Sequence, residues 1–261
     1  MGDMQGKFVW YELMTTDIPA AARFYDSVVG WNARDAGMGL ESPYWLLEMP
    51  GQKQATGGLQ ALPEDMKAMR VPPNWTGYVA VDDVDATAEK CVELGGTIRR
   101  PPDDIPGIGR FAVLADPQGP VIIAFKPAPM DGDMPPEPAM GTPGFVGWCE
   151  LYAKDVDKAF DYYRQLFGWE KIDEMDMGPK GKYLLFGRDG QMTGGMMRQE
   201  EDGPFCGWSY YFAVDTLDAA LDRVEAGGGR VLEGPMEVPG AWVLQAQDPQ
   251  GAYFCLVAPA R

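Results

Sequence analysis

YELMTTDIPAAARFYDSVVGW, the stretch from Tyr11 to Trp31, recurs as CELYAKDVDKAFDYYRQLFGW, from Cys149 to Trp169. Two shorter matches follow in the same order: VAVDDVDAT at Val79 with FAVDTLDAA at Phe212, and ADPQGP at Ala115 with QDPQGA at Gln247. The repeat length of about 135 residues exceeds that of a solenoid unit and is typical of a whole domain. The sequence therefore predicts a duplicated domain.

The segment between the two copies differs in composition from both. Residues 128–144 are rich in proline and glycine and show almost no periodic apolar pattern. This composition is typical of a linker. We therefore predict a first domain over residues 1–127, a linker over 128–144 and a second domain over 145–261.

Each copy begins with a strand that leads into a helix. The segment from Phe8 to Met14 is rich in β-formers, and Asp17 offers an N-cap directly after it. Apolar side chains then recur at helical spacing from Ile18 to Val29, and Gly30 suits the C-terminal stop.

The same pattern restarts inside each copy. Further elements are predicted as strands over Tyr44–Met49, Thr56–Leu62, Gly77–Val81, Phe111–Leu114 and Val121–Phe125, and as helices over Val84–Leu94, Val156–Phe167 and Leu217–Ala226. The turn Asp116-Pro117-Gln118-Gly119 places proline and glycine where a tight turn favours them. The chain is thus predicted to contain four βαβββ modules, an α+β fold.

Composition excludes several classes of function. The 261 residues carry 22 lysines and arginines against 39 aspartates and glutamates, a formal net charge of −17. This charge repels phosphate backbones and anionic lipids, so we expect neither nucleic-acid nor membrane partners. No apolar run approaches the roughly 20 residues that span a bilayer, and no signal-peptide pattern is visible. Four cysteines without a CxxC pair indicate reduced thiols and a cytoplasmic protein.

The chain contains no histidine. Ser-His-Asp and Cys-His catalysis, histidine-bound zinc and the two-histidine, one-carboxylate iron site are therefore excluded. Acid–base chemistry must use carboxylates, tyrosine, lysine, cysteine or water.

The pattern DxxxAxxFYxxxxGW that begins at Asp17, followed by VDDVDA and a DPxG turn, resembles the vicinal-oxygen-chelate superfamily of glyoxalases, bleomycin-resistance proteins and extradiol dioxygenases. The resemblance recurs in both copies and covers nearly the whole chain outside the linker. The WYEL and WCEL openings are similar to tandem-domain glyoxalase-like proteins. The resemblance implies that paired modules form two open, curved, eight-stranded mixed-sheet barrels, each with a pocket on its concave side.

The resemblance also implies where metal ligands would lie. Three positions in each copy can be placed: Trp10, Thr76 and Ile123 in the first, and Trp148, Ser209 and Cys255 in the second. None of these side chains suits a hard divalent cation, and Cys255 alone suits a soft one. We therefore expect no cofactor at the usual place, with an atypically bound divalent metal as the alternative.

Alternation along the first strand of each copy nominates two acids. Trp10 and Glu12 share one face of their strand, and Trp148 and Glu150 share the matching face in the second copy. A carboxylate beside an indole suggests a partly apolar pocket with a polar anchor. Glu12 and Glu150 are the candidate catalytic residues, as general bases or as metal ligands. The alternative is that they reach solvent or pair with arginine.

Two further tyrosines and a cysteine are candidate ligand-binding residues. Tyr78 and Tyr211 share the faces of Thr76 and Ser209, where their hydroxyls would meet a ligand or their rings would pack in the core. Cys255 lacks a histidine partner and is interpreted as a buried thiol.

Two functions from different classes fit this pattern. The first is a glyoxalase-like enzyme with carboxylate-based lyase or isomerase chemistry at Glu12 and Glu150. The second is a protein of bleomycin-resistance type that sequesters a planar or apolar small molecule without catalysis. Because duplication supplies the module pairing that other family members achieve by dimerising, we expect a monomer.

Overall fold

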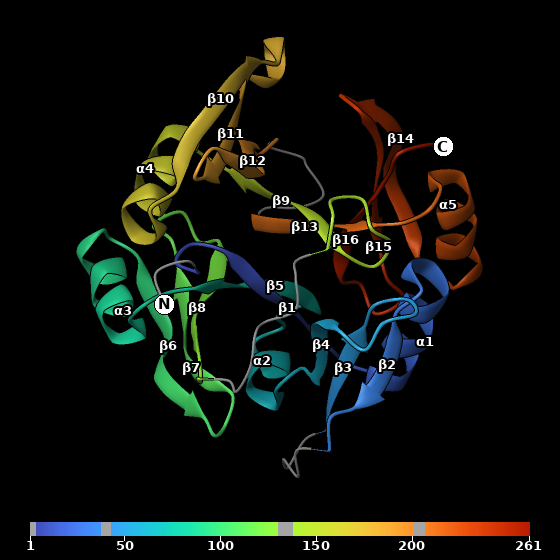
Figure 1. The fold of residues 1–261 in the computed structure, drawn as a ribbon, viewed down its shortest axis with the longest axis horizontal. Coiled ribbons are helices and arrows are strands. Elements are labelled where there is room, and N and C mark those ends of the chain that lie inside the picture. The colour runs from blue at the N-terminus through green and yellow to red at the C-terminus, as the bar shows by residue number, and fades with distance from the viewer. Residues whose placement is uncertain (1–3, 38–42, 130–137, 201–206) are drawn as a thin grey trace. The chain divides into compact units, whose positions relative to one another are not determined.

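A computed structural model describes residues 4–37, 43–129, 138–200 and 207–261. Within these residues, sixteen strands form two mixed sheets of eight strands, both open (Figure 1). The strand orders are β2-β3-β4-β1-β5-β8-β7-β6 and β10-β11-β12-β9-β13-β16-β15-β14. The predicted α+β class and its four βαβββ modules are confirmed.

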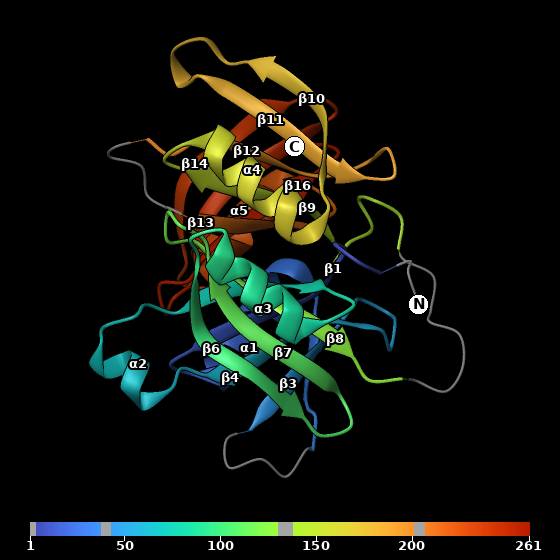
Figure 2. The same ribbon diagram turned by 90° about the vertical axis from the view of Figure 1, so that its left-hand side faces the viewer.

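The first two modules supply one sheet. Module 1 comprises β1 (Phe8–Thr15), α1 (Ile18–Val29), β2 (Asn32–Asp35), β3 (Tyr44–Glu48) and β4 (Ala55–Ala61). A short helix, α2 (Glu64–Ala68), precedes module 2, which comprises β5 (Asn74–Ala80), α3 (Val84–Glu93), β6 (Thr97–Ile105), β7 (Gly109–Ala115) and β8 (Val121–Pro127). In Figure 2, α3 lies over β6 and β7.

The last two modules supply the other sheet. Module 3 comprises β9 (Val146–Ala153), α4 (Val156–Phe167), β10 (Glu170–Asp176), the 3-10 turn η1 (Gly178–Lys180), β11 (Lys182–Arg188) and β12 (Gln191–Arg198). Module 4 comprises β13 (Gly207–Ala213), α5 (Leu217–Ala226), β14 (Arg230–Val238), β15 (Ala241–Gln247) and β16 (Tyr253–Ala258).

The chain divides into two compact units, and each unit draws on both copies of the repeat. One unit holds the described residues of Met1–Val9, Thr76–Met134 and Trp148–Trp208, and the other those of Trp10–Trp75, Pro135–Gly147 and Ser209–Arg261. Modules 2 and 3 thus pack in one unit and modules 1 and 4 in the other. The domain limits 1–127 and 145–261 stay a prediction, and residues 130–137 of the predicted linker lie outside the described residues.

The helix signals in the sequence act as predicted. Asp17 accepts a hydrogen bond from the Ala20 amide at 2.9 Å, and the matching Asp155 accepts one from Lys158 at 3.1 Å. Gly30 then ends α1 in the left-handed conformation, with φ of 87°, which glycine adopts without a Cβ clash. These local contacts set the length of each helix.

Gly30 and the matching Gly168, which ends α4, are each followed by a tryptophan that lies in an aromatic core. Trp31 is 1% exposed, donates from Nε1 to the Gly144 carbonyl at 2.8 Å, and lies 4.7 Å from the Phe212 ring. In the other unit, Trp169 donates to the Gly6 carbonyl at 2.7 Å and stacks on Phe186. The glycine–tryptophan ending of each repeat therefore anchors one unit.

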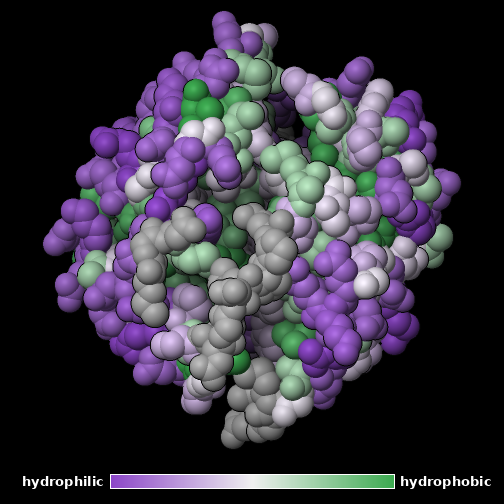
Figure 3. All heavy atoms as spheres, in the orientation of Figure 1, coloured by the Kyte–Doolittle hydropathy of each residue, from purple (hydrophilic) through white to green (hydrophobic). Residues whose placement is uncertain are grey.

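The described surface and thiols agree with a charged exterior and a reduced interior. Hydrophilic residues predominate on the face seen in Figure 3. Cys91, Cys149 and Cys255 are buried free thiols, while Cys206 lies outside the described residues. No helix in the described part of the chain combines the length and the apolar character that crossing a membrane requires.

The Asp-Pro-Gln-Gly turn of the second copy carries a buried acid. Asp248 is 4% exposed, and its Oδ1 accepts hydrogen bonds from the Gln250 and Ala252 amides, both at 2.9 Å. The Tyr25 hydroxyl donates to its Oδ2 at 3.2 Å. Burial nonetheless raises the pKa of Asp248, because it penalises the charged carboxylate more than these donors stabilise it.

This raised pKa predicts a pH-dependent difference between the wild type and Asp248→Asn. The folded protein holds the proton more tightly than the unfolded chain, where aspartate titrates near about 3.9. As the pH falls from 7 toward 4, the free energy of unfolding of the wild type should therefore rise relative to that of Asp248→Asn, since asparagine does not titrate. Urea unfolding of both proteins at several pH values measures this difference. A wild-type advantage that shrinks on acidification would contradict the assignment.

Candidate functional site

A buried carboxylate on β1 is held by a chain of hydrogen bonds. Glu12 is 6% exposed and lies on the same face of β1 as Trp10. The Tyr44 hydroxyl, from β3, donates to Glu12 Oε2 at 3.0 Å and accepts from Trp10 Nε1 at 2.9 Å. Gln60, from β4, donates through Nε2 to Glu12 Oε1 at 2.5 Å. Three strands therefore fix this one side chain.

The second copy builds the same chain in the other unit. Glu150, on β9, is also 6% exposed. The Tyr183 hydroxyl, from β11, donates to Glu150 Oε2 at 2.6 Å and accepts from Trp148 Nε1 at 2.9 Å. We call these two arrangements the Glu12 site and the Glu150 site. Each carboxylate is buried and accepts a hydrogen bond from a tyrosine beside a tryptophan, which is the kind of position that binding sites use.

A glycine makes room for each tyrosine. A Cβ added at Gly58 would lie 2.1 Å from the Tyr44 hydroxyl oxygen, and one at Gly195 would lie 2.2 Å from that of Tyr183. No heavy-atom pair tolerates such distances, so any larger residue would displace the phenol. The absence of a side chain at this position on β4 and β12 lets the ring cross the strand and reach the acid.

The environment keeps both tyrosines protonated. Burial, and then the negative charge of Glu12, raise the pKa of Tyr44 well above its ordinary value. The pKa of Tyr183 is raised in the same way by burial and by Glu150. Each phenol is therefore a permanent hydrogen-bond donor near neutral pH, directed at one carboxylate oxygen.

Adjacent glycines on β12 offer a matched pair of substitutions. A Cβ at Gly194 would lie 1.9 Å from the Cys149 carbonyl oxygen, which belongs to the backbone of β9. Gly194→Ala must therefore separate two paired strands, and we expect it to cost about 1–3 kcal/mol of stability. Gly195→Ala meets the far end of the Tyr183 ring, so it should leave the strands paired but displace the phenol and break its hydrogen bonds with Glu150 and Trp148, at a cost of about 1–3 kcal/mol.

Urea unfolding and a crystal structure of each variant test this difference. An unmoved Tyr183 ring in Gly195→Ala, or an unchanged pairing of β9 with β12 in Gly194→Ala, would contradict it.

The remaining predicted ligand-binding residues are buried on the central strands. Thr76 and Tyr78 lie on β5, and Ser209 and Tyr211 lie on β13. Tyr78 pairs in register with Ile123 of β8, and Tyr211 pairs with Cys255 of β16. The Cys255 thiol is fully buried and donates to the Tyr253 hydroxyl at 3.6 Å, as a structural thiol would. A role of these six residues in ligand binding stays a prediction.

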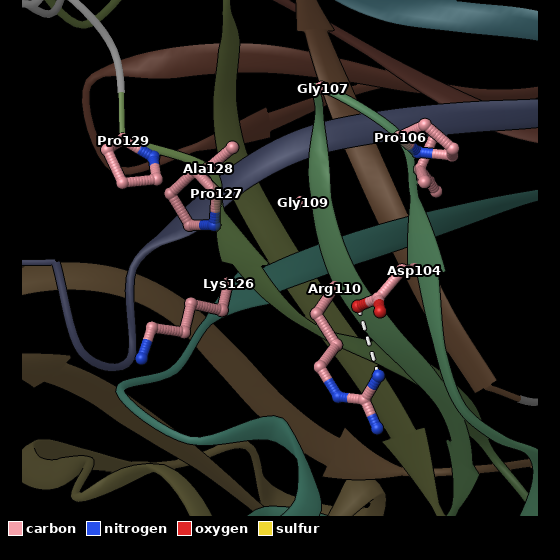
Figure 4. A pocket seen from close by; sticks show the side chains of 10 residues that line it. Asp104, Pro106, Gly107, Gly109, Arg110, Lys126, Pro127, Ala128 and Pro129 are labelled. Carbon is pink, nitrogen blue, oxygen red and sulfur yellow. Dashed lines mark hydrogen bonds and ion pairs between the residues drawn. The ribbon is translucent and has the colours of Figure 1, made fainter.

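A surface hollow lies apart from these residues. It has a volume of about 320 Å³ and is lined by residues of β6, β7, β8 and the segments next to them (Figure 4). Arg110 at its edge already binds Asp85 and Asp104. No predicted site residue lines this hollow.

Metal-binding side chains do not gather in the described residues. No group of three or more cysteine, aspartate or glutamate side chains there is arranged to hold a metal ion. Trp10, at a position where the resemblance implies a metal ligand, donates from its indole N–H to the Tyr44 hydroxyl.

Sequence reasoning missed three residues of the two sites. Tyr44, Tyr183 and Gln60 all contact a candidate acid, yet none was nominated. The repeat carried a signal for two of them, because each tyrosine stands at the start of the strand that pairs with a glycine doublet. The residue that matches Gln60 in the second copy is Met197, so the repeat carried no such signal for Gln60.

Comparison with protein families places the chain. The model of the Glyoxalase/Bleomycin resistance protein/Dioxygenase superfamily matches residues 145–256, and that of a Glyoxalase-like domain matches residues 10–123. The protein CFP32 of Mycobacterium tuberculosis, named as a glyoxylase, is 31% identical over 98% of this chain and 96% of its own. The chain belongs to the Glyoxalase/Bleomycin resistance protein/Dioxygenase superfamily, and the predicted resemblance is confirmed.

Further relatives and solved structures resemble the chain over most of its length. The anthracycline biosynthesis protein DnrV of Streptomyces peucetius is 29% identical over 97% of this chain and 93% of its own. The Mn(II)-bound glyoxalase of Novosphingobium aromaticivorans shares 14% identity with a TM-score of 0.63, covering 98% of this chain and 82% of that one. The 2,3-dioxygenase LapB of Pseudomonas sp. KL28 has a TM-score of 0.62 at 14% identity, covering 98% and 93%. At this identity the two structures establish the fold alone.

Proposed function

We propose that the chain is a glyoxalase-like protein with two small-molecule sites, in which Glu12 and Glu150 are general bases for lyase or isomerase chemistry. The observation that carries this proposal is the Trp–Tyr–Glu chain of hydrogen bonds, built twice from matching strands. A buried structural carboxylate also needs hydrogen bonds, but one arrangement built from matching strands in both copies favours a shared role in which the acid is held in a fixed position, as a base must be.

The chemistry open to these residues is proton transfer. One carboxylate oxygen would take a proton from a substrate carbon and return it to a neighbouring atom, or assist departure of a leaving group. The tyrosine donates to the same carboxylate and fixes its orientation. Trp10 and Trp148, both half-buried, would form an apolar wall against which the substrate lies.

The residues present do not fit the divalent metal of many superfamily members. The strand positions expected to hold it carry Trp10, Thr76 and Ile123 in one copy, and these offer an indole N–H, one hydroxyl and no donor atom. The second copy offers only Ser209 and Cys255 in addition to Trp148. We therefore propose that the usual metal site is lost and that the carboxylates act without it.

A second candidate function is binding without catalysis. Two relatives are named as anthracycline biosynthesis proteins, which suggests a planar aromatic ligand for this chain. Each acid lies beside a tryptophan and a tyrosine, which would stack on such a ligand. In this case Thr76, Tyr78, Ile123, Ser209, Tyr211 and Cys255 would complete the walls, as the sequence predicts.

A ligand screen tests both forms of the proposal. Compounds that raise the melting temperature of the wild type are retested on the variant that carries Glu12→Gln and Glu150→Gln. We expect the shift to disappear in the double variant, because the ligand loses its charged anchor. Compounds that stabilise both proteins equally would overturn the proposal. Turnover of a stabilising compound distinguishes the enzyme from the binder.

We also propose that the protein acts as a cytoplasmic monomer. Each compact unit already pairs a module of the first copy with one of the second, so no second chain is needed to complete it. Sedimentation should give a mass near 28.6 kDa at all concentrations. A dimer that persists at nanomolar concentration would contradict this.

A further inference from the structure

The Glu12 and Glu150 sites differ at two positions beside the acid. In the first site Met14 of β1 pairs in register with Gln60 of β4, and in the second Tyr152 of β9 pairs with Met197 of β12. All four side chains are half-buried. Met14 and Tyr152 lie two residues after the acid, and Gln60 and Met197 lie two residues after the glycine, so each shares the strand face of that residue. The tryptophan, tyrosine, glycine and glutamate are otherwise identical in type.

These substitutions change what each site offers to a ligand. Gln60 donates through Nε2 to Glu12. The side-chain amide of Gln60 therefore lies against the carboxylate and also carries a carbonyl oxygen that can accept a hydrogen bond. Met197, at the matching position, has only a polarisable thioether and cannot donate a hydrogen bond. Tyr152 places an aromatic ring in the second site at the position that Met14 occupies in the first. The first site is therefore the more polar, and the second has two aromatic rings besides its tryptophan.

We propose that the pairs Met14–Gln60 and Tyr152–Met197 determine specificity and give the two sites different ligands. The Glu150 site takes a flat aromatic group that carries a hydrogen-bond donor, because Trp148, Tyr183 and Tyr152 provide ring surfaces near one carboxylate. The Glu12 site takes a polar, non-aromatic group with several donors and acceptors. This inference rests on the proposed function of the two acids.

The test isolates each site with a single acid variant. In Glu12→Gln only the Glu150 site keeps its charge, and in Glu150→Gln only the Glu12 site does. The probes are proflavine, a planar aromatic cation, and agmatine, a non-aromatic cation with several donors, both titrated calorimetrically at physiological salt to suppress binding to the acidic surface. We expect Glu12→Gln to bind proflavine about tenfold more tightly than Glu150→Gln, with the order reversed for agmatine.

Reciprocal exchange shows whether the two pairs cause this preference. Adding Tyr152→Met and Met197→Gln to Glu12→Gln should weaken proflavine binding about tenfold, and adding Met14→Tyr and Gln60→Met to Glu150→Gln should strengthen it. These exchanges use side chains that the matching positions already accommodate, so the fold should survive, and circular dichroism checks this.

The outcomes separate this inference from the proposed function. Three outcomes would overturn the inference alone. The two single variants bind proflavine equally well, Glu12→Gln does not bind proflavine up to about 1 mM, or the exchanges leave both preferences in place. Undiminished binding of both probes by the Glu12→Gln, Glu150→Gln double variant would overturn the proposed function itself.

Discussion

Replacing Glu12 and Glu150 together by glutamine is expected to lower turnover of a substrate by about 10²- to 10⁴-fold, which is the usual contribution of a positioned general base. Glutamine keeps the size of the side chain and can still accept from the tyrosine, so the strands should remain in place. If the protein only binds its ligand, loss of the charged acceptor should weaken affinity by about 1.5–3 kcal/mol per site.

A third carboxylate provides the control for this experiment. Glu48 is 7% exposed on β3 and accepts a hydrogen bond from the Arg34 guanidinium at 2.5 Å. Glu48 is about as buried as Glu12, and Glu48→Gln makes the same chemical change as Glu12→Gln. Glu48 differs in that it forms an ion pair with Arg34. Glu48→Gln should alter stability and leave turnover or affinity unchanged. A loss of function in Glu48→Gln equal to that of the double variant would indicate a general effect of buried charge.

The largest expected effect on stability is that of Trp31→Ala. The Trp31 ring is 1% exposed, lies 4.7 Å from Phe212 and 5.7 Å from Tyr25, and donates to the Gly144 carbonyl. Truncation removes this packing and leaves a buried carbonyl without its donor. We expect the free energy of unfolding to fall by about 3–5 kcal/mol.

Urea unfolding of three variants measures this effect. Trp169→Ala, which removes the matching tryptophan from the other unit, should cost a similar amount because Trp169 makes the same kind of contacts. Trp242→Ala is the control, since Trp242 is half-buried and its ring lies 5.4 Å from the Arg261 guanidinium. A cost below about 1 kcal/mol for Trp31→Ala would show that the glycine–tryptophan ending of the repeat is not an anchor.

The helices were the most predictable part of the fold because their signals are local. The caps Asp17 and Asp155 and the stop at Gly30 lie within a few residues of the helix they delimit. Strands at the sheet edges were harder to predict. For example, β6 contains Pro101 and Pro102, which interior strands avoid but which an edge strand with irregular register tolerates.

The grouping of modules into units could not be predicted from repetition alone. The duplication indicates which segments are alike but not which segments pack together. The contact of Trp31 with Phe212, and that of Tyr25 with Asp248, join segments that lie far apart in the sequence. Such contacts carry no local sequence pattern.

The tryptophan and the glutamate of each candidate site could be predicted from the alternation of side chains along one strand, whereas the tyrosine could not. A period of two places Trp10 and Glu12 on one face of β1 without further information. The tyrosine that joins them comes from β3 and reaches them only because Gly58 on the intervening strand has no side chain. Such a contact depends on three strands at once, and the sequence of any one of them does not reveal it.

We propose that each copy of the repeat presents a tyrosine-bound carboxylate, and not a metal ion, to its ligand. A crystal structure of the protein purified without chelators and bound to a stabilising compound from the screen tests it most directly. We predict a donor atom of the compound within about 3 Å of the Glu12 or Glu150 carboxylate, with Tyr44 and Tyr183 still donating. A divalent ion bound at the strand positions of Trp10 or Trp148, with those indoles turned out to solvent, would contradict the account.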